Sequence, residues 1–168
     1  MQRRTVLKLG MGSTALLLLA GGAAVLLQPG WHRGALSPLG REVFAAVGQA
    51  VLDKSLPAAE MARQTAIEGL LGRVDVLVRA LPPHAQDELS QLLSLLGSTA
   101  GRRTLAGLGP AWADASVAEV QLALQGMRTA SLALRQQAYA ALHDIATGAY
   151  FADAATWPML GYPGPLKI

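Results

Sequence analysis

The hydrophobic positions of the chain recur at helical spacing over most of its length. The clearest pattern covers residues 67–81, where apolar side chains recur every three or four residues and form one stripe along a helix. No stretch alternates with period two over the length of an ordinary strand. The sequence therefore predicts an all-α domain built as a small bundle of four to six helices. The stripe consists of Ile67, Leu70, Leu71, Val74, Leu77, Val78 and Leu81.

Capping residues and prolines set the ends of the first three predicted helices. Ser37-Pro38 places a hydroxyl cap before a proline at the first helical position, and Leu56-Pro57 ends that helix. Pro82-Pro83 ends the helix that carries the 67–81 stripe, because the residue before a proline is disfavoured in the helical conformation. A third helix is predicted over residues 84–96, with its leucines directed inward.

The second half of the predicted domain contains one glycine-rich connection and one long helical region. Residues 97–109 are punctuated by glycine and predict turns around a single short helix. Ser116-Val117-Ala118-Glu119 is a capping-box pattern, and the helical region that it opens extends to about Ala149. Residues 126–131 either bend this region or continue it. The helical domain is therefore expected to cover residues 37–149.

Two flanking segments lack the helical pattern. Residues 28–36 are expected to form a glycine-rich linker, with Trp31 placed where an interfacial aromatic residue would lie. Residues 150–168 contain half of the eight aromatic residues and three prolines, which predict an irregular tail. The aromatic side chains of the tail either cover the open end of the bundle or form a docking surface, and both can hold together. The candidate docking residues are Tyr150, Phe151, Trp157, Gly161, Tyr162 and Pro163.

Residues 1–27 combine a basic start with an apolar run. Leu9 to Leu27 contain no ionisable side chain, and the polar Gln28-Pro29-Gly30 follows, which is typical of an export or anchoring signal. Nineteen helical residues would span about 28 Å, close to the hydrocarbon core of a bilayer. The small residues that cleavage requires, at 20–24, lie inside the run. An uncleaved anchor is therefore favoured over a released protein, and both remain open.

Charge and cysteine content narrow the classes of function. Three of the fourteen basic residues lie in the leader, so the remainder carries eleven basic and eleven acidic residues and no net charge. A nucleic-acid-binding domain needs a basic surface, and this balance excludes that class. The absence of cysteine excludes disulfides, thiolate metal sites, iron–sulfur clusters and covalent c-type haem attachment.

The sequence offers no residues in a catalytic, cofactor-binding or metal-binding pattern. His32, His84 and His143 share no metal-ligand spacing, and the carboxylates are scattered along predicted helix faces. The remaining candidates are arginines. Arg102-Arg103 lie in the glycine-rich connection, and Arg128 and Arg135 are seven residues apart, which places them on roughly one face of a helix. These could bind an anion, but solvated charges paired with Asp or Glu are the preferred interpretation.

Arg3, Arg4, Leu7 and Lys8 resemble the twin-arginine export signal, whose usual form is Ser/Thr-Arg-Arg-x-Phe-Leu-Lys. This chain has Gln2 and Val6 at the other two positions of that form. The resemblance implies recognition by the twin-arginine export machinery and transport in the folded state, often with a bound partner. It places the protein on the periplasmic side of the bacterial inner membrane.

Two further segments are Ser37-Pro38-x-x-Arg41-x-x-Phe44 and the tail from Trp157 to Pro165. Together they resemble segments of the small subunits of membrane-bound bacterial flavin dehydrogenases, of the gluconate 2-dehydrogenase subunit 3 type. Gly161-Tyr162-Pro163-Gly164 is the most specific part. Tyr150-Phe151-Ala152-Asp153 stands where longer relatives have an aromatic Gly-Gly-Asn element.

That resemblance implies a non-catalytic accessory subunit without a cofactor of its own. In such complexes a flavoprotein dehydrogenase large subunit holds the flavin and a cytochrome c accepts the electrons. The small subunit escorts the large one through export and can tether it to the membrane. The alternative is a stand-alone, exported, membrane-anchored helical protein that binds a small ligand within its bundle.

Overall fold

The helix α3 (Pro38–Val51) lies at the centre of the fold and contacts four other helices. The computed structural model describes residues 28–164, without the side chains of Met159 and Leu160. Ser37 caps α3 as the sequence predicts, because its hydroxyl accepts a hydrogen bond from the backbone N–H of Gly40, and Pro38 opens the helix. The predicted leader, including Arg3, Arg4, Leu7 and Lys8, lies outside the described residues.

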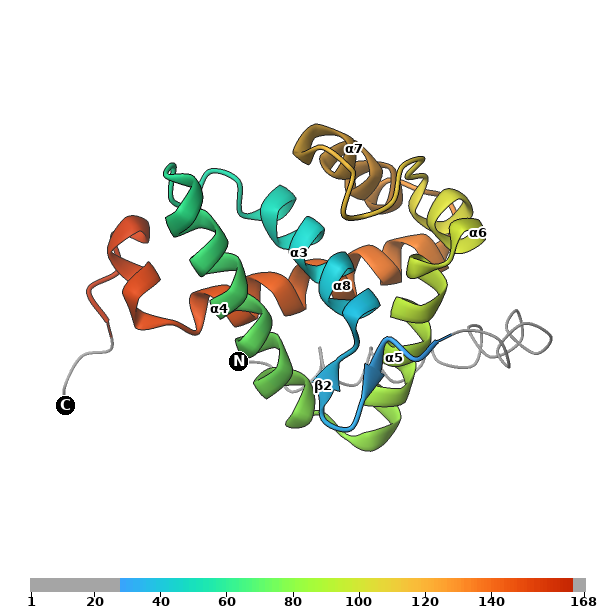
Figure 1. The fold of residues 1–168 in the computed structure, drawn as a ribbon, viewed down its shortest axis with the longest axis horizontal. Helices are drawn as coiled ribbons and strands as arrows, with labels where there is room; N and C mark the ends of the chain where they lie inside the picture. Colours follow the sequence, from blue (N-terminus) through green and yellow to red (C-terminus); the bar gives the residue numbers. More distant parts are fainter. Residues whose placement is uncertain (1–27, 165–168) are drawn as a thin grey trace.

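Four helices surround α3 (Figure 1): α4 (Glu60–Arg79), α5 (Pro83–Gly97), α7 (Val117–Arg128) and α8 (Ala133–Phe151). The largest fully buried side chains come from all five helices, so the core is continuous from α3 outward. In the 67–81 stripe, five side chains are buried and Leu77 and Leu81 are partly buried. The described part of the chain is therefore mostly helical, and the prediction of an all-α bundle is confirmed for it.

The glycine-rich connection contains the short α6 (Thr99–Gly101) and a π-helical turn, η2 (Arg102–Ala106). Both hydrogen bonds of the capping box predicted at the start of α7 are present. The Ser116 hydroxyl accepts from the backbone N–H of Glu119, and the Glu119 carboxylate accepts from the backbone N–H of Ser116. Residues 129–132 break the long helical region into α7 and α8. The break lets both helices pack on α3 and on each other, which one continuous helix could not do.

Residues 28–36 form a clamped hairpin rather than the predicted linker. β1 (Trp31–His32) pairs antiparallel with β2 (Ala35–Leu36), and the turn has positive φ at Arg33 (52°) and Gly34 (81°). Trp31 is 7% exposed and packs on the domain, so it is not the interfacial aromatic residue that the sequence suggests. Two-residue strands are too short to show a period of two, which is why the pattern missed them.

The tail is more regular than its prolines suggest. The helix α8 continues to Phe151, and η3 (Ala154–Leu160) is a 3₁₀ helix that contains Pro158. A short 3₁₀ helix tolerates proline because the fixed φ of proline fits its geometry and only one N–H is lost. Among residues 28–164, no helix is both long enough and apolar enough to cross a membrane.

Candidate docking surface

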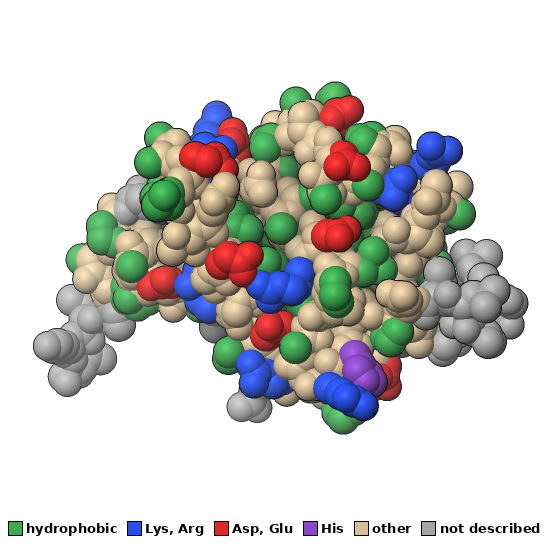
Figure 2. Space-filling view, in the orientation of Figure 1, with side chains coloured by type: hydrophobic (Ala, Val, Ile, Leu, Met, Phe, Trp, Pro, Cys, Tyr) green, Lys and Arg blue, Asp and Glu red, His purple; other side chains and the backbone are tan. Residues whose placement is uncertain are grey.

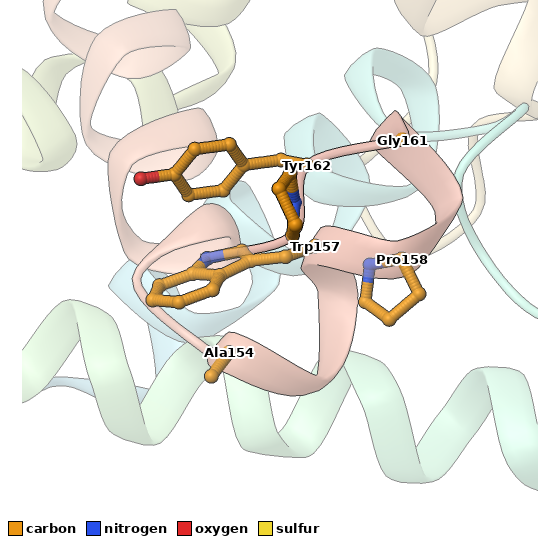
Figure 3. Close-up of a pocket in the computed structure, with 6 residues that line it drawn as sticks. Ala154, Trp157, Pro158, Gly161 and Tyr162 are labelled. Atoms are coloured by element: carbon orange, nitrogen blue, oxygen red, sulfur yellow. The ribbon is translucent and has the colours of Figure 1, made fainter. Parts of the chain in front are cut away.

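A shallow hollow of about 320 Å³ lies on the outer side of η3 and the turn that follows it (Figure 3). The rings of Trp157 and Tyr162 lie one above the other in its wall, with centroids 5.3 Å apart and planes at 64°. This edge-to-face arrangement is a favourable one for two aromatic rings. We call this hollow the tail surface. Its lining residues are Ala154, Trp157, Pro158, Gly161, Tyr162 and Pro163.

Hydrogen bonds within the tail hold the two rings in place. The Asp153 carboxylate caps η3 by accepting from the N–H of Ala155 (3.0 Å), and the Trp157 indole donates to the carbonyl of Phe151 (2.9 Å). Gly161, with φ of 67°, turns the chain back so that the N–H of Tyr162 donates to the carbonyl of Trp157 (3.2 Å). A left-handed residue at this turn favours glycine, which explains Gly161 in the docking set.

Arg73 of α4 attaches the tail to the bundle. Its Nε donates to the carbonyl of Ala149 at 2.8 Å, and its Nη1 lies 3.1 Å from Oδ2 of Asp153. The side chains of Arg73 and Asp153 are 29% and 37% exposed, so solvent screens the pair and its contribution to stability is at most about 1 kcal/mol. The function of this contact is therefore to orient η3.

Tyr150 belongs to the core and not to the tail surface. Its ring is 4% exposed, and its hydroxyl donates to the carbonyl of Ser55 at 2.8 Å. Burial raises the pKa of this phenol. The half-buried Phe151 ring packs edge-on against Tyr150, with centroids 5.2 Å apart.

The structure thus brings together four of the six candidate docking residues, namely Trp157, Gly161, Tyr162 and Pro163, and directs Tyr150 and Phe151 toward the bundle. Ala154 and Pro158 also line the hollow and were missed, because the tail was expected to be irregular. Asp153-Ala154-Ala155 was the available signal, since an aspartate before small residues is a typical helix cap.

Tyr162 is also the only aromatic residue among the large exposed hydrophobic side chains of the described chain. Its exposed fraction is 47%, and the other four are single aliphatic side chains on or next to helices. The tail that carries Tyr162 lies at the left end of the molecule in Figure 1, and Figure 2 shows hydrophobic side chains there among polar ones. The other four are Met61, Val76, Leu122 and Leu132.

A second hollow, of about 160 Å³, lies between α3 and the segment that leads into α7. Its lining combines two polar residues of α3, Glu42 and Gln49, with Trp112, several alanines and two valines. Small-molecule pockets are usually about 300–1,000 Å³, so this hollow fits no more than a single side chain or a very small ligand.

The predicted arginine candidates have structural contacts. Arg135 donates from Nε to the carbonyl of Leu105 (2.9 Å), and the buried Arg102 donates from Nη2 to the carbonyl of Gly109 (3.4 Å). Both therefore brace the glycine-rich connection. Arg128 ends α7 while Arg135 lies on α8, so the shared helix face inferred from their spacing does not exist.

The histidines lie apart from one another in the described chain. His143 stacks on Tyr139 and lies 3.0 Å from Asp144, its sequence neighbour, on the exposed side of α8. His32 and His84 are exposed on the hairpin and at the start of α5. Among residues 28–164, no three metal-ligating side chains come together. Comparisons with family models, with curated proteins and with solved structures found no match to this chain.

Proposed function

We propose that this protein is a non-catalytic accessory subunit that binds a partner protein through its tail surface and holds that partner at the membrane through residues 1–27. The observation that supports the proposal is the pairing of the exposed Tyr162 ring with the half-buried Trp157 ring at a capped and anchored 3₁₀ helix. Exposed aromatic residues on a rigid support are typical anchors of protein interfaces, because they bury a large area at a small cost in side-chain entropy.

The composition of the tail surface favours a protein segment as its occupant. All six lining residues are apolar or glycine, and the hollow is open and shallow. A small polar substrate would find no charged side chain there to orient it, whereas an apolar side chain of a partner would cover both rings. A central apolar contact with a polar rim is the usual anatomy of such an interface.

The partner that we propose is the large subunit of a flavoprotein dehydrogenase that passes electrons to a cytochrome c on the periplasmic side of the inner membrane. This part rests on the sequence resemblance of the leader and of Trp157 to Pro165. The twin-arginine machinery transports folded proteins, so a leader of this type is what we expect on a chain that is exported together with a folded partner. The chemistry belongs to the partner, and this chain needs no cofactor for the role.

The test is affinity purification of the full chain from solubilised membranes, with the tag inserted in the 129–132 loop, away from the tail surface. A co-purifying polypeptide with a flavin absorbance spectrum is expected. Tyr162→Ala should release it, whereas Tyr162→Phe should retain it because the ring is kept. Leu122→Ala, at a residue that is 74% exposed on α7, is the matched control for removal of exposed apolar surface and should have no effect.

Two outcomes would contradict the proposal. Retention of the partner by both Tyr162→Ala and Trp157→Ala, with unchanged thermal unfolding, would remove the tail surface as the docking site. A single colourless polypeptide would instead favour the stand-alone, ligand-binding alternative, for which the hollow between α3 and α7 is the feature to test with small ligands.

A further inference from the structure

The first described residues are bound tightly to α5. The hydroxyl of Ser94 lies 2.7 Å from the carbonyl of Gln28 and accepts from the N–H of Gly30 at 3.1 Å. The hydroxyl of Ser90 accepts from the N–H of Trp31 (3.1 Å) and lies 3.0 Å from its carbonyl. Both serines thus bond to the main chain, so the path of residues 28–31 along α5 is fixed independently of their side chains.

These contacts give the bound segment a direction. Trp31 bonds to α5 through its indole at Gln86 (3.1 Å) and through its backbone at Ser90. Gln28 bonds to Ser94, which lies one helical turn further along α5. The chain therefore reaches Gln28 near the C-terminal end of α5. Only Ser98 separates that end from α6 and η2.

The apolar run ends at Leu27, immediately before this bound segment. Because one residue spans at most about 3.6 Å of extended chain, no linker in the sequence separates the apolar run from the bound Gln28. The polar headgroup region of a bilayer is only about 6 Å thick on each side of the hydrocarbon core. If the run spans the bilayer, the end of α5 must therefore lie at the headgroups.

The charge of this end fits an anionic lipid surface. Residues 89–113 contain no acidic residue, and of their two arginines Arg102 is buried and Arg103 faces solvent. Arg103 is exposed, as are Thr99, Ala100 and Thr104 beside it. Figure 1 places α6 at one end of the long axis and the C-terminal tail at the other, and Figure 2 shows basic side chains near α6.

We infer that the end of the domain formed by the last turn of α5, α6 and η2 rests on anionic phospholipid headgroups, held there by the clamp of residues 28–31 on Ser90 and Ser94. The inference rests on the membrane anchoring in the proposed function and adds an orientation to it. With α6 on the lipid, the tail surface points away from the bilayer, where a large soluble partner can reach it.

The chain contains no cysteine, so single-cysteine variants can be labelled cleanly. Thr99→Cys places an environment-sensitive fluorophore on the proposed lipid-facing end, and Met61→Cys, at a residue 81% exposed near the start of α4, places it toward the opposite end. The full chain is reconstituted in vesicles of phosphatidylcholine and phosphatidylglycerol that carry headgroup quenchers. The label at position 99 should be strongly quenched and the label at position 61 should not.

Two further variants test the clamp and the charge. A flexible insert of about twenty residues between Leu27 and Gln28 adds roughly 25 Å of reach and should abolish most of the quenching at position 99 while the protein stays with the vesicles. In the same long-linker chain, Arg103→Glu should weaken the residual headgroup contact by roughly fivefold or more, because that contact then depends on charge alone, and should weaken it less in phosphatidylcholine alone.

The outcomes separate this inference from the anchoring on which it rests. A chain that floats with the vesicles but shows equal quenching at positions 61 and 99 would overturn the orientation and leave the anchor standing. Quenching at position 99 that the insert does not change would overturn the clamp as its cause. A chain that does not float with the vesicles at all would overturn the anchor itself, and the orientation with it.

Discussion

The two ends of the described chain each contain a tryptophan, and these two residues are held in different ways. Trp31 is 7% exposed and bonds through its indole to Gln86, fifty-five residues away. Trp157 is half-buried and bonds to Phe151, only six residues away. One end is thus part of the core of the bundle, whereas the other is a local structure that rests on the bundle.

This difference separates the two ends by function. The aromatic side chain and the backbone groups of the hairpin are hydrogen-bonded to α5, so the hairpin adds stability and fixes the position of Gln28 on the domain. The tail has long-range contacts mainly through Arg73, and it keeps the ring of Tyr162 accessible. A segment that satisfies its own hydrogen bonds locally leaves its apolar surface free for a partner.

The largest expected effect is that of Gly30→Ala, which breaks the hairpin clamp. A Cβ at this position would overlap the Cβ of Leu93 and crowd the carbonyl of Ser90, so the hairpin must move away from α5. We expect the free energy of unfolding to fall by about 3 kcal/mol, measured by urea denaturation of the full chain in detergent. Gly72→Ala is the control: no atom lies within 4 Å of its Cβ, and it should stabilise α4 by about 0.5–1 kcal/mol.

The variants Ser94→Ala and Thr156→Val compare the stability that is lost when one hydroxyl group is removed from each end. Ser94 is 6% exposed and joins Gln28 and Gly30 to α5, so its loss should cost about 2 kcal/mol because buried backbone groups lose their partners. Thr156 donates only to the carbonyl of Asp153, three residues before it, and its loss should cost about 0.5–1 kcal/mol. Equal costs in the same denaturation experiment would remove the distinction between the two ends.

Arg73→Gln should loosen the tail with little change in the bundle. Losing the contacts to Ala149 and Asp153 should lower the stability of η3 by about 1 kcal/mol, and proteolysis within residues 152–164 should become roughly fivefold faster. Arg79→Gln, on the same helix, is the control because Arg79 bonds only to the backbone of its own helix. If thermal unfolding of the whole bundle fell as much as the tail loosened, the tail would be part of the core.

The smallest effect concerns a helix that belongs to neither end. Hydrogen bonds from the side chain and the backbone of Ser116 lower the pKa of the Glu119 carboxyl in the folded state. The resulting stabilisation of α7 is present above the ordinary pKa of glutamate and is lost as the pH falls through the lowered folded value. Between about pH 6 and about pH 3, Glu119→Gln should flatten part of the fall in the urea midpoint. A fall of the same size in both proteins would show that the pKa of the Glu119 carboxyl is the same in the folded and unfolded states.

The helices and the starts of α3 and α7 could be predicted because they depend on residues close together in the chain. Ser37-Pro38, the 67–81 stripe and the box at Ser116 and Glu119 each act within four residues or one helix face. The predicted end of the first helix at Leu56-Pro57 was wrong, because α3 already ends at Val51 and Leu52 forms its C-cap. The hairpin was missed because its strands have two residues each. Its one local signal is Arg33-Gly34, a weaker form of the Asn-Gly turn.

The tail was predicted in composition but not in arrangement. The aromatic residues and Gly161 were identified from the sequence, whereas the assignment of Tyr150 to the core depends on the carbonyl of Ser55, ninety-five residues away. The pairing of Trp157 with Tyr162 depends on η3, which the prolines of the tail argued against.

The sequence by itself determined that the domain is helical, where α3 and α7 begin and which helix faces are apolar, because capping, backbone hydrogen bonding and helical periodicity are local. Only the tertiary structure decided which of the two flanking tryptophans is buried. Whether a segment without a repeating pattern of apolar residues is buried depends on the shape and the polar groups of the surface against which it packs. For Trp31 that surface includes Gln86 and Ser90 of α5, and nothing in residues 28–36 specifies it.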